Sequence, residues 1–233
     1  MIWRRHRGIQ QPVDERIKTR TLGRAGSSLY HLAFIRNCHR WLAVGYSLLD
    51  ARSLATAPEP AITGELVRAM KEAKLRSDAP TWMIRMYAAD DPPVNSPGRL
   101  GKHRRRVDME FERSEKGTTF HFHCEAKRLY RSGSIGEYLG QEGLGMFLTG
   151  EYARNEHVGG MLGYVQTENE DNWIARLRTV LGSDQQTYQV ASDGQLEVAG
   201  LATELPQVQV SRHERPLVGQ PIIIYHTFLA FLS

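Results

Sequence analysis

The tripeptide Glu-Ala-Lys occurs twice in the sequence, and a carboxylate and an ammonium group at that spacing could do acid–base or metal chemistry. One copy begins at Glu72 in RAMKEAKLRS, and the other begins at Glu125 in HFHCEAKRLY. The first copy lies in a segment with helical spacing of its apolar residues, where side chains two positions apart point roughly 200° apart. Its charged groups cannot serve one site, so we interpret it as helix surface.

The second copy lies in a predicted strand, where alternate side chains share one face. Along FHFHCEAK, apolar residues alternate with His121, His123, Glu125 and Lys127. The preceding segment RVDMEFER alternates in the same way and has Asp108 on its polar face. If the apolar faces of both segments pack in one core, their polar faces coincide as well.

A turn at Lys116-Gly117 would make these segments a hairpin, and its register decides which residues meet. A two- or four-residue loop centred there places Asp108 opposite Glu125, and a slip by two residues places it opposite Lys127. A slip by one residue would move apolar side chains onto the charged face, so the pattern excludes it. Opposed Cβ atoms lie roughly 4.5–5.5 Å apart, and therefore two carboxylates and a lysine converge.

Two carboxylates at that separation repel each other unless a cation lies between them. Oxygen ligands of this kind prefer a hard divalent ion, which here predicts Mg²⁺ or Mn²⁺. A neighbouring lysine would orient or help to deprotonate a water molecule and would stabilise developing negative charge. The combination favours metal-assisted hydrolysis of a phosphodiester.

Asp108, Glu125 and Lys127 together resemble the signature of the PD-(D/E)XK nuclease superfamily, in which an Asp opens one strand and Glu-x-Lys lies on the next. The resemblance covers roughly residues 60 to 180. It implies a restriction-endonuclease-like core with the order helix–strand–strand–strand–helix–strand. It also implies a metal-dependent endonuclease, acting on DNA in restriction, repair or defence.

The resemblance further implies which other groups assist the two carboxylates in holding the metal. The main-chain carbonyl of Ala126 would be one ligand. Many family members add a glutamate from the helix before the first strand, and Glu65 is the matching candidate in this sequence. Val107 departs from the signature, which has Pro before the Asp, at a position that varies widely in the family.

The flanking elements predict an α/β fold with a mixed β-sheet flanked by helices, a helical N-terminal extension and a β-rich C-terminal part. Thr63 is the expected N-cap of the helix before the hairpin. The expected parts are a basic arm and long amphipathic helix over 1–55, a nuclease-like core over 56–181 and a β-rich extension over 182–233, within one compact domain. The segments expected as elements of the core are GELVRAMKEAKL (helix), TWMIRMYAA (strand), SIGEYLGQEGLGMFLTGEYA (helix), GGMLGYVQT (strand) and DNWIARLRTVL (helix).

A basic loop, GRLGKHRRR, stands immediately before Asp108. The net charge of +4 does not by itself imply a nucleic-acid partner. A basic cluster at the mouth of the site would imply such a partner, because contacts to phosphates supply most of the non-specific affinity for nucleic acid. The alternative is that the basic loop is only a solvated surface. The residues expected to contact nucleic acid are Lys102, Arg104, Arg105, Arg106 and Arg128.

Cysteine usage and hydropathy predict a cytoplasmic protein without membrane contact. The two cysteines, Cys38 and Cys124, have no spacing typical of small disulfide-linked domains. The N-terminus lacks the apolar run of a signal peptide, and charged residues interrupt the longest apolar region. A homodimer and a partner protein in a multi-subunit system both remain open.

Three other interpretations compete with the nuclease. The polar strand face could be a solvated surface with cross-strand ion pairs, or the fold could be a catalytically inactive module that binds nucleic acid or protein. The H-x-H spacing of His121 and His123, followed by Glu125, is also typical of a zinc or cupin-like site. The wider cupin spacing is absent, and the sequence has no second Cys or His cluster.

Overall fold

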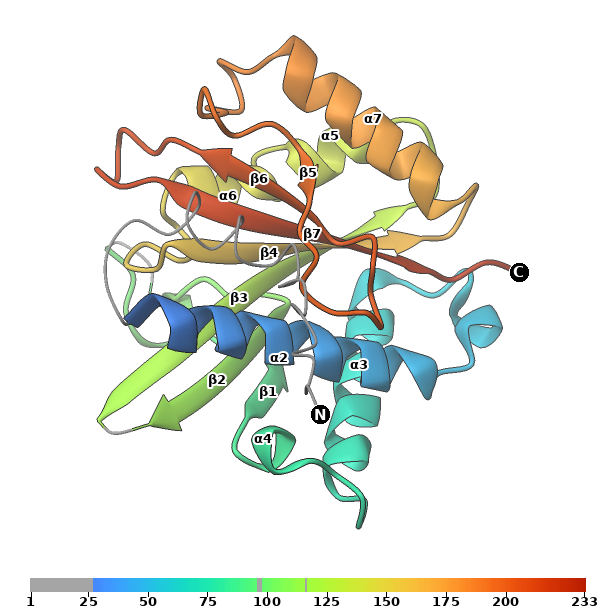
Figure 1. Cartoon of the computed structure of the whole chain (residues 1–233). Helices are drawn as coiled ribbons and strands as arrows, with labels where there is room; N and C mark the ends of the chain where they lie inside the picture. Colours follow the sequence, from blue (N-terminus) through green and yellow to red (C-terminus); the bar gives the residue numbers. More distant parts are fainter. Residues whose placement is uncertain (1–26, 96–97, 116) are drawn as a thin grey trace, which may run out of the picture.

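The alternating segments of the chain form one mixed β-sheet of seven strands with helices on both of its faces, as the computed structural model shows (Figure 1). The structure describes residues 27–95, 98–115 and 117–233, so the predicted basic arm lies almost wholly outside the described residues. The strands are β1 (Tyr87–Asp90), β2 (Met109–Glu115), β3 (Thr118–Leu129), β4 (Val158–Val165), β5 (Glu197–Val198), β6 (Gln209–His213) and β7 (Ile222–Ala230).

The strand order across the sheet is β1-β2-β3-β4-β7-β6-β5. The first three strands form an antiparallel meander, and β4 and β7 run parallel to β3. β6 and β5 then complete the sheet with antiparallel pairing. Residues 182–233 therefore supply three strands of the same sheet that carries the hairpin.

The helices divide the core into two layers, one on each side of the sheet (Figure 1). Side chains of α2 and α3 pack with Phe122, Cys124 and Ala126 on one face. Side chains of α5, α6 and α7 pack with Leu129 and other sheet residues on the opposite face. The helices are α2 (Ser27–Ser47), α3 (Glu59–Lys74), α4 (Thr81–Ile84), α5 (Ser134–Leu139), α6 (Leu144–Leu148) and α7 (Glu170–Ser183), with short 3-10 helices η1 (Ala51–Leu54) and η2 (Gly101–His103).

The hairpin has the predicted register that places Asp108 opposite Glu125, and not the register slipped by two residues. Met109 pairs with Cys124, Glu110 with His123 and Glu115 with Thr118, which leaves two residues in the loop. Continuing this register by one position places Asp108 opposite Glu125. The left-handed φ of 80° at Gly117 suits the tight turn, because glycine adopts positive φ without a steric penalty.

Three local predictions were wrong. Helix α3 begins at Glu59 after Pro58, not after Thr63, whose buried hydroxyl instead donates to the Glu59 carbonyl. The segment TWMIRMYAA, predicted as a strand throughout, begins with the short helix α4, and only Tyr87–Ala89 at its end belongs to β1. The glycine-rich segment from 134 to 153 forms the two short helices α5 and α6, and only glycine fits at position 143 between them, because a Cβ there would lie 2.2 Å from the Tyr138 carbonyl oxygen.

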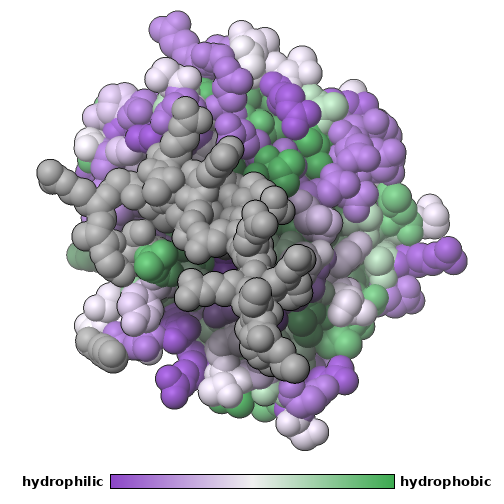
Figure 2. All heavy atoms as spheres, in the orientation of Figure 1, coloured by the Kyte–Doolittle hydropathy of each residue, from purple (hydrophilic) through white to green (hydrophobic). Residues whose placement is uncertain are grey.

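None of the helices within the described residues combines the length and the apolar character needed to cross a bilayer. In the view of Figure 2, hydrophilic side chains project around the outline, and hydrophobic side chains lie in separate patches between them.

Candidate functional site

Asp108, Glu125 and Lys127 come together on the face of β3 that packs towards α5 and α6. The ammonium Nζ of Lys127 lies 2.6 Å from Glu125 Oε1 and 4.0 Å from Asp108 Oδ2. Asp108 Oδ2 also accepts a hydrogen bond of 2.7 Å from the main-chain N–H of Ala126. This hydrogen bond fixes the Asp108 side chain although Asp108 stands just before β2.

A fourth charged group at the site, Glu59, was missed by the sequence-based prediction. Its Oε1 lies 3.5 Å from Lys127 Nζ, although the two residues are 68 positions apart. Glu59 is in the first turn of α3, where a carboxylate is also favoured by the helix dipole. The sequence does hold a signal for this helix start, since proline is common in the first turn and Pro60 follows Glu59 directly.

The prediction that Glu65 belongs to this site was wrong. Glu65 is half-exposed and forms an ion pair with Arg68 on the surface of α3. Six positions separate it from Glu59, and six helical residues correspond to a rotation of roughly 600°, which is 240° around the axis. The two glutamates therefore point to different sides of the helix, and only Glu59 reaches Lys127.

The carboxylates of this cluster outnumber its cations. Glu59, Asp108 and Glu125 surround the ammonium of Lys127, and the side chains of Glu125 and Lys127 are only 8% and 16% exposed. Burial, together with the charge of Asp108, raises the pKa of Glu125 to about 8. The second oxygen of Glu125, Oε2, is buried and has no hydrogen-bond partner among the described residues.

Lys127 keeps its charge in this setting. Burial alone would lower the pKa of Lys127, but the carboxylates of Glu125 and Glu59 outweigh it and raise this pKa. Burial also raises the pKa of Glu59. The ammonium is therefore fixed beside a carboxylate that exchanges its proton near neutral pH, an arrangement frequent in functional sites.

Tyr152 closes the site from the segment that follows α6. Its hydroxyl donates a 2.6 Å hydrogen bond to the carbonyl of Arg106, two residues before Asp108. Burial and the charges of Glu125 and Asp108 raise the pKa of Tyr152, so the phenol stays neutral. Tyr152 thus joins the basic loop to the carboxylate cluster, a role that no local sequence pattern indicated.

The basic loop stands next to the site, and several of its charges are already paired. Arg105 lies 3.4 Å from Glu151, and Arg106 lies 2.7 Å from Asp91. Arg104 donates to the Gly101 carbonyl, and Lys102 is exposed. Both ion pairs are partly exposed to solvent. A single exposed ion pair contributes only about 0–1 kcal/mol to the free energy of unfolding, so a phosphate could replace either acidic partner.

Arg128 belongs to a structural tether at the end of β3. Its Nε donates a 2.6 Å hydrogen bond to Gln166, and its guanidinium lies 4.7 Å from the ring centroid of Tyr130. The amide of Gln166 in turn donates to the carbonyls of Leu54 and Ala57. These contacts hold the chain just before Glu59 in place.

The histidines of the H-x-H pair contact Glu110 rather than Glu125. Glu110 Oε1 lies 2.8 Å from His121 Nδ1 and 3.1 Å from His123 Nε2. The structure therefore groups these histidines with Glu110 and not with Glu125, because the hairpin register sets Glu110 directly opposite His123.

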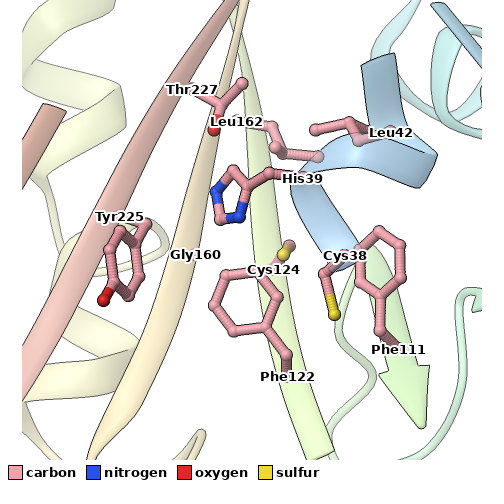
Figure 3. Close-up of a pocket in the computed structure, with 10 residues that line it drawn as sticks. All are labelled: Cys38, His39, Leu42, Phe111, Phe122, Cys124, Gly160, Leu162, Tyr225 and Thr227. Atoms are coloured by element: carbon pink, nitrogen blue, oxygen red, sulfur yellow. The ribbon is translucent and has the colours of Figure 1, made fainter. Parts of the chain in front are cut away.

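A small crevice on the opposite face of the sheet contains both cysteines and His39 (Figure 3). The crevice has no room for a water-sized sphere. Burial raises the pKa of both thiols, Cys38 and Cys124, well above the usual value, which disfavours the reactive thiolate. We therefore regard this crevice as part of the core rather than as a binding site.

Searches against protein-family profiles, curated proteins and solved structures found no match for the chain.

Proposed function

We propose that the protein is a Mg²⁺- or Mn²⁺-dependent nuclease that hydrolyses phosphodiester bonds in DNA. The observation that carries this proposal is the convergence of Asp108, Glu125 and Glu59 around Lys127, with a buried carboxylate oxygen left without a partner. The order α3-α4-β1-β2-β3-α5-α6-β4 supports it, because apart from the short helix α4 it follows the helix–strand–strand–strand–helix–strand order of a restriction-endonuclease-like core.

The donor set fits a hard divalent cation. Its ligands would be one oxygen each from Asp108 and Glu125 and the carbonyl of Ala126. The Ala126 oxygen accepts a 2.7 Å hydrogen bond from Lys127, and its second lone pair is available for a metal. Such an ion polarises the phosphoryl group and lowers the pKa of bound water when it is present. It would also offset the burial and the repulsion by Asp108 that keep the pKa of Glu125 high.

The charged state of Lys127 favours an electrostatic role over that of a general base. A lysine with a raised pKa holds its proton at neutral pH and cannot accept another. Its ammonium would instead donate hydrogen bonds to the attacking water or to the phosphoryl oxygen on which negative charge develops. Glu125 and Glu59 would fix the ammonium in this position before substrate binds.

The substrate would reach the site along the basic loop. Lys102, Arg104, Arg105 and Arg106 precede Asp108, so phosphates bound there would lie close to the carboxylates. Arg128 is expected to act indirectly, through the Gln166 tether that positions Glu59.

The test is cleavage of plasmid, linear duplex, single-stranded DNA and RNA by purified protein, with Mg²⁺, Mn²⁺ or EDTA. We expect metal-dependent cleavage of DNA that falls at least about 10²-fold in Asp108→Asn, since this change removes a metal ligand but keeps the side-chain shape. DNA binding by the wild-type protein without cleavage in either metal would instead support the inactive binding module.

Glu59→Gln and Glu65→Gln form a matched pair on one helix. We expect Glu59→Gln to lower cleavage by about 10- to 100-fold, because Lys127 loses a partner that holds it in place. Glu65→Gln should leave the rate unchanged, since that residue pairs only with surface groups. Initial rates on supercoiled plasmid measure both. Equal rates for the two variants would remove Glu59 from the site.

A further inference from the structure

A second polar cluster lies on the same face of the hairpin, farther from the end of β3. Glu110 comes from β2, and His121 and His123 come from β3. One oxygen of Glu110 contacts a ring nitrogen of each histidine, at 2.8 Å and 3.1 Å. The two imidazole rings are stacked, with centroids 5.9 Å apart and planes 8° from parallel. The three side chains therefore form one compact group that bridges two strands.

The donor atoms of this group are close enough to share one ion. All three potential ligand atoms lie within 4.8 Å of one another. In a tetrahedral zinc site with bonds of about 2.0–2.1 Å, ligand atoms are separated by roughly 3.3 Å. The observed nitrogen–oxygen distances of 2.8 Å and 3.1 Å differ from that value by less than an ångström. Only small side-chain movements are needed to admit an ion.

His123 is the most deeply buried member of the group. The side chain of His123 is 9% exposed, and its Nδ1 atom is buried without a hydrogen-bond partner among the described residues. Its other nitrogen faces Glu110. A buried polar atom without a hydrogen-bond partner lowers the stability of the fold. The alternation of apolar residues along the strand does not by itself require a histidine at position 123. A metal ion shared with Glu110 would be bound by Nε2, the nitrogen that faces Glu110, and such a role would account for the histidine.

We propose that Glu110, His121 and His123 form a binding site for a divalent transition-metal ion, with zinc as the best fit. Two imidazoles and one carboxylate suit zinc, whereas Mg²⁺ prefers oxygen ligands alone. Three protein ligands leave a fourth position for water or substrate, as in zinc sites with an open coordination position. The site is separate from the carboxylate–lysine cluster, and the proposal does not depend on nuclease activity.

The experiment uses metal-stripped full-length protein without a histidine tag. Calorimetry with Zn²⁺ should show one equivalent bound with micromolar or tighter affinity, and Co²⁺ should give the visible absorption bands of a tetrahedral site. Glu110→Gln and His121→Ala should each weaken Zn²⁺ binding by about 10²-fold or more, on the scale of losses at metal sites. Glu110→Gln keeps the side-chain shape, so a folding defect in the histidine variant would not obscure the result.

Two control variants locate the ion. His103→Ala removes an exposed histidine of η2 and should leave Zn²⁺ binding unchanged. Glu72→Gln removes an exposed carboxylate that pairs with Arg68 on α3 and should also leave it unchanged. The proposal is overturned if the stripped wild-type protein binds neither Zn²⁺ nor Co²⁺. It is equally overturned if Zn²⁺ binding survives Glu110→Gln and His121→Ala, or is lost in His103→Ala or Glu72→Gln.

Discussion

Lys127→Met is expected to reduce phosphodiester cleavage by roughly 10²–10³-fold while Mn²⁺ binding persists. The substitution keeps an aliphatic side chain of similar length but removes the ammonium, which lies 2.6 Å from Glu125 and 3.5 Å from Glu59. The proposed metal ligands remain in place, so the loss should fall on the chemical step. Single-turnover cleavage at saturating enzyme and calorimetry with Mn²⁺ separate the two effects.

The matched control is Lys71→Met on α3. Lys71 is half-exposed and lies 3.9 Å from Asp90, so its removal should change neither cleavage nor metal binding. Lys74, in the other Glu-Ala-Lys tripeptide, is less suitable because its ammonium donates to the Met86 carbonyl and lies over the Trp41 ring. If Lys127→Met cleaves as fast as Lys71→Met, the electrostatic role of Lys127 is excluded.

Glu125→Gln should abolish cleavage and Mn²⁺ binding at the carboxylate–lysine cluster, and it should change how stability depends on pH. Burial and the charge of Asp108 raise the pKa of Glu125 to about 8, well above the value of about 4.3 expected in the unfolded chain. Between these two values the folded state holds a proton that the unfolded state has released. The stabilisation that this bound proton gives the folded state is therefore complete below pH about 4.3 and is lost as pH rises through about 8.

Comparing the melting temperatures of the wild-type protein and the Glu125→Gln variant isolates the titration of Glu125, because His121 and Glu59 titrate in both proteins. In metal-free buffer, the melting temperature of the wild-type protein should fall relative to that of Glu125→Gln as pH rises from about 4 to about 9, a range that brackets the window of roughly 4.3 to 8. Mn²⁺ should then raise the melting temperature of the wild-type protein more than that of Glu125→Gln, which keeps only the Glu110–His121–His123 cluster as a metal site. Parallel pH profiles for the two proteins would contradict the raised pKa.

The sequence by itself determined the central part of the site. Side chains alternate across a strand, so the spacing of Glu125 and Lys127 placed them on one face regardless of the rest of the fold. The apolar pattern excluded a one-residue slip, and the register with a two-residue loop then set Asp108 opposite Glu125. The same register sets Glu110 opposite His123, so the histidine cluster could also have been identified from the sequence.

Only the tertiary structure decided which helix residue joins the site. Local propensity did not distinguish a helix that begins at Glu59 from one that begins after Thr63, because Thr63 is also a good N-cap residue. Packing resolved this choice: the Thr63 hydroxyl is buried 2.8 Å from that of Tyr164 on β4, which holds α3 with Glu59 directed at Lys127. A contact between residues 68 positions apart depends on how helix and sheet pack, and strand periodicity contains no information about it.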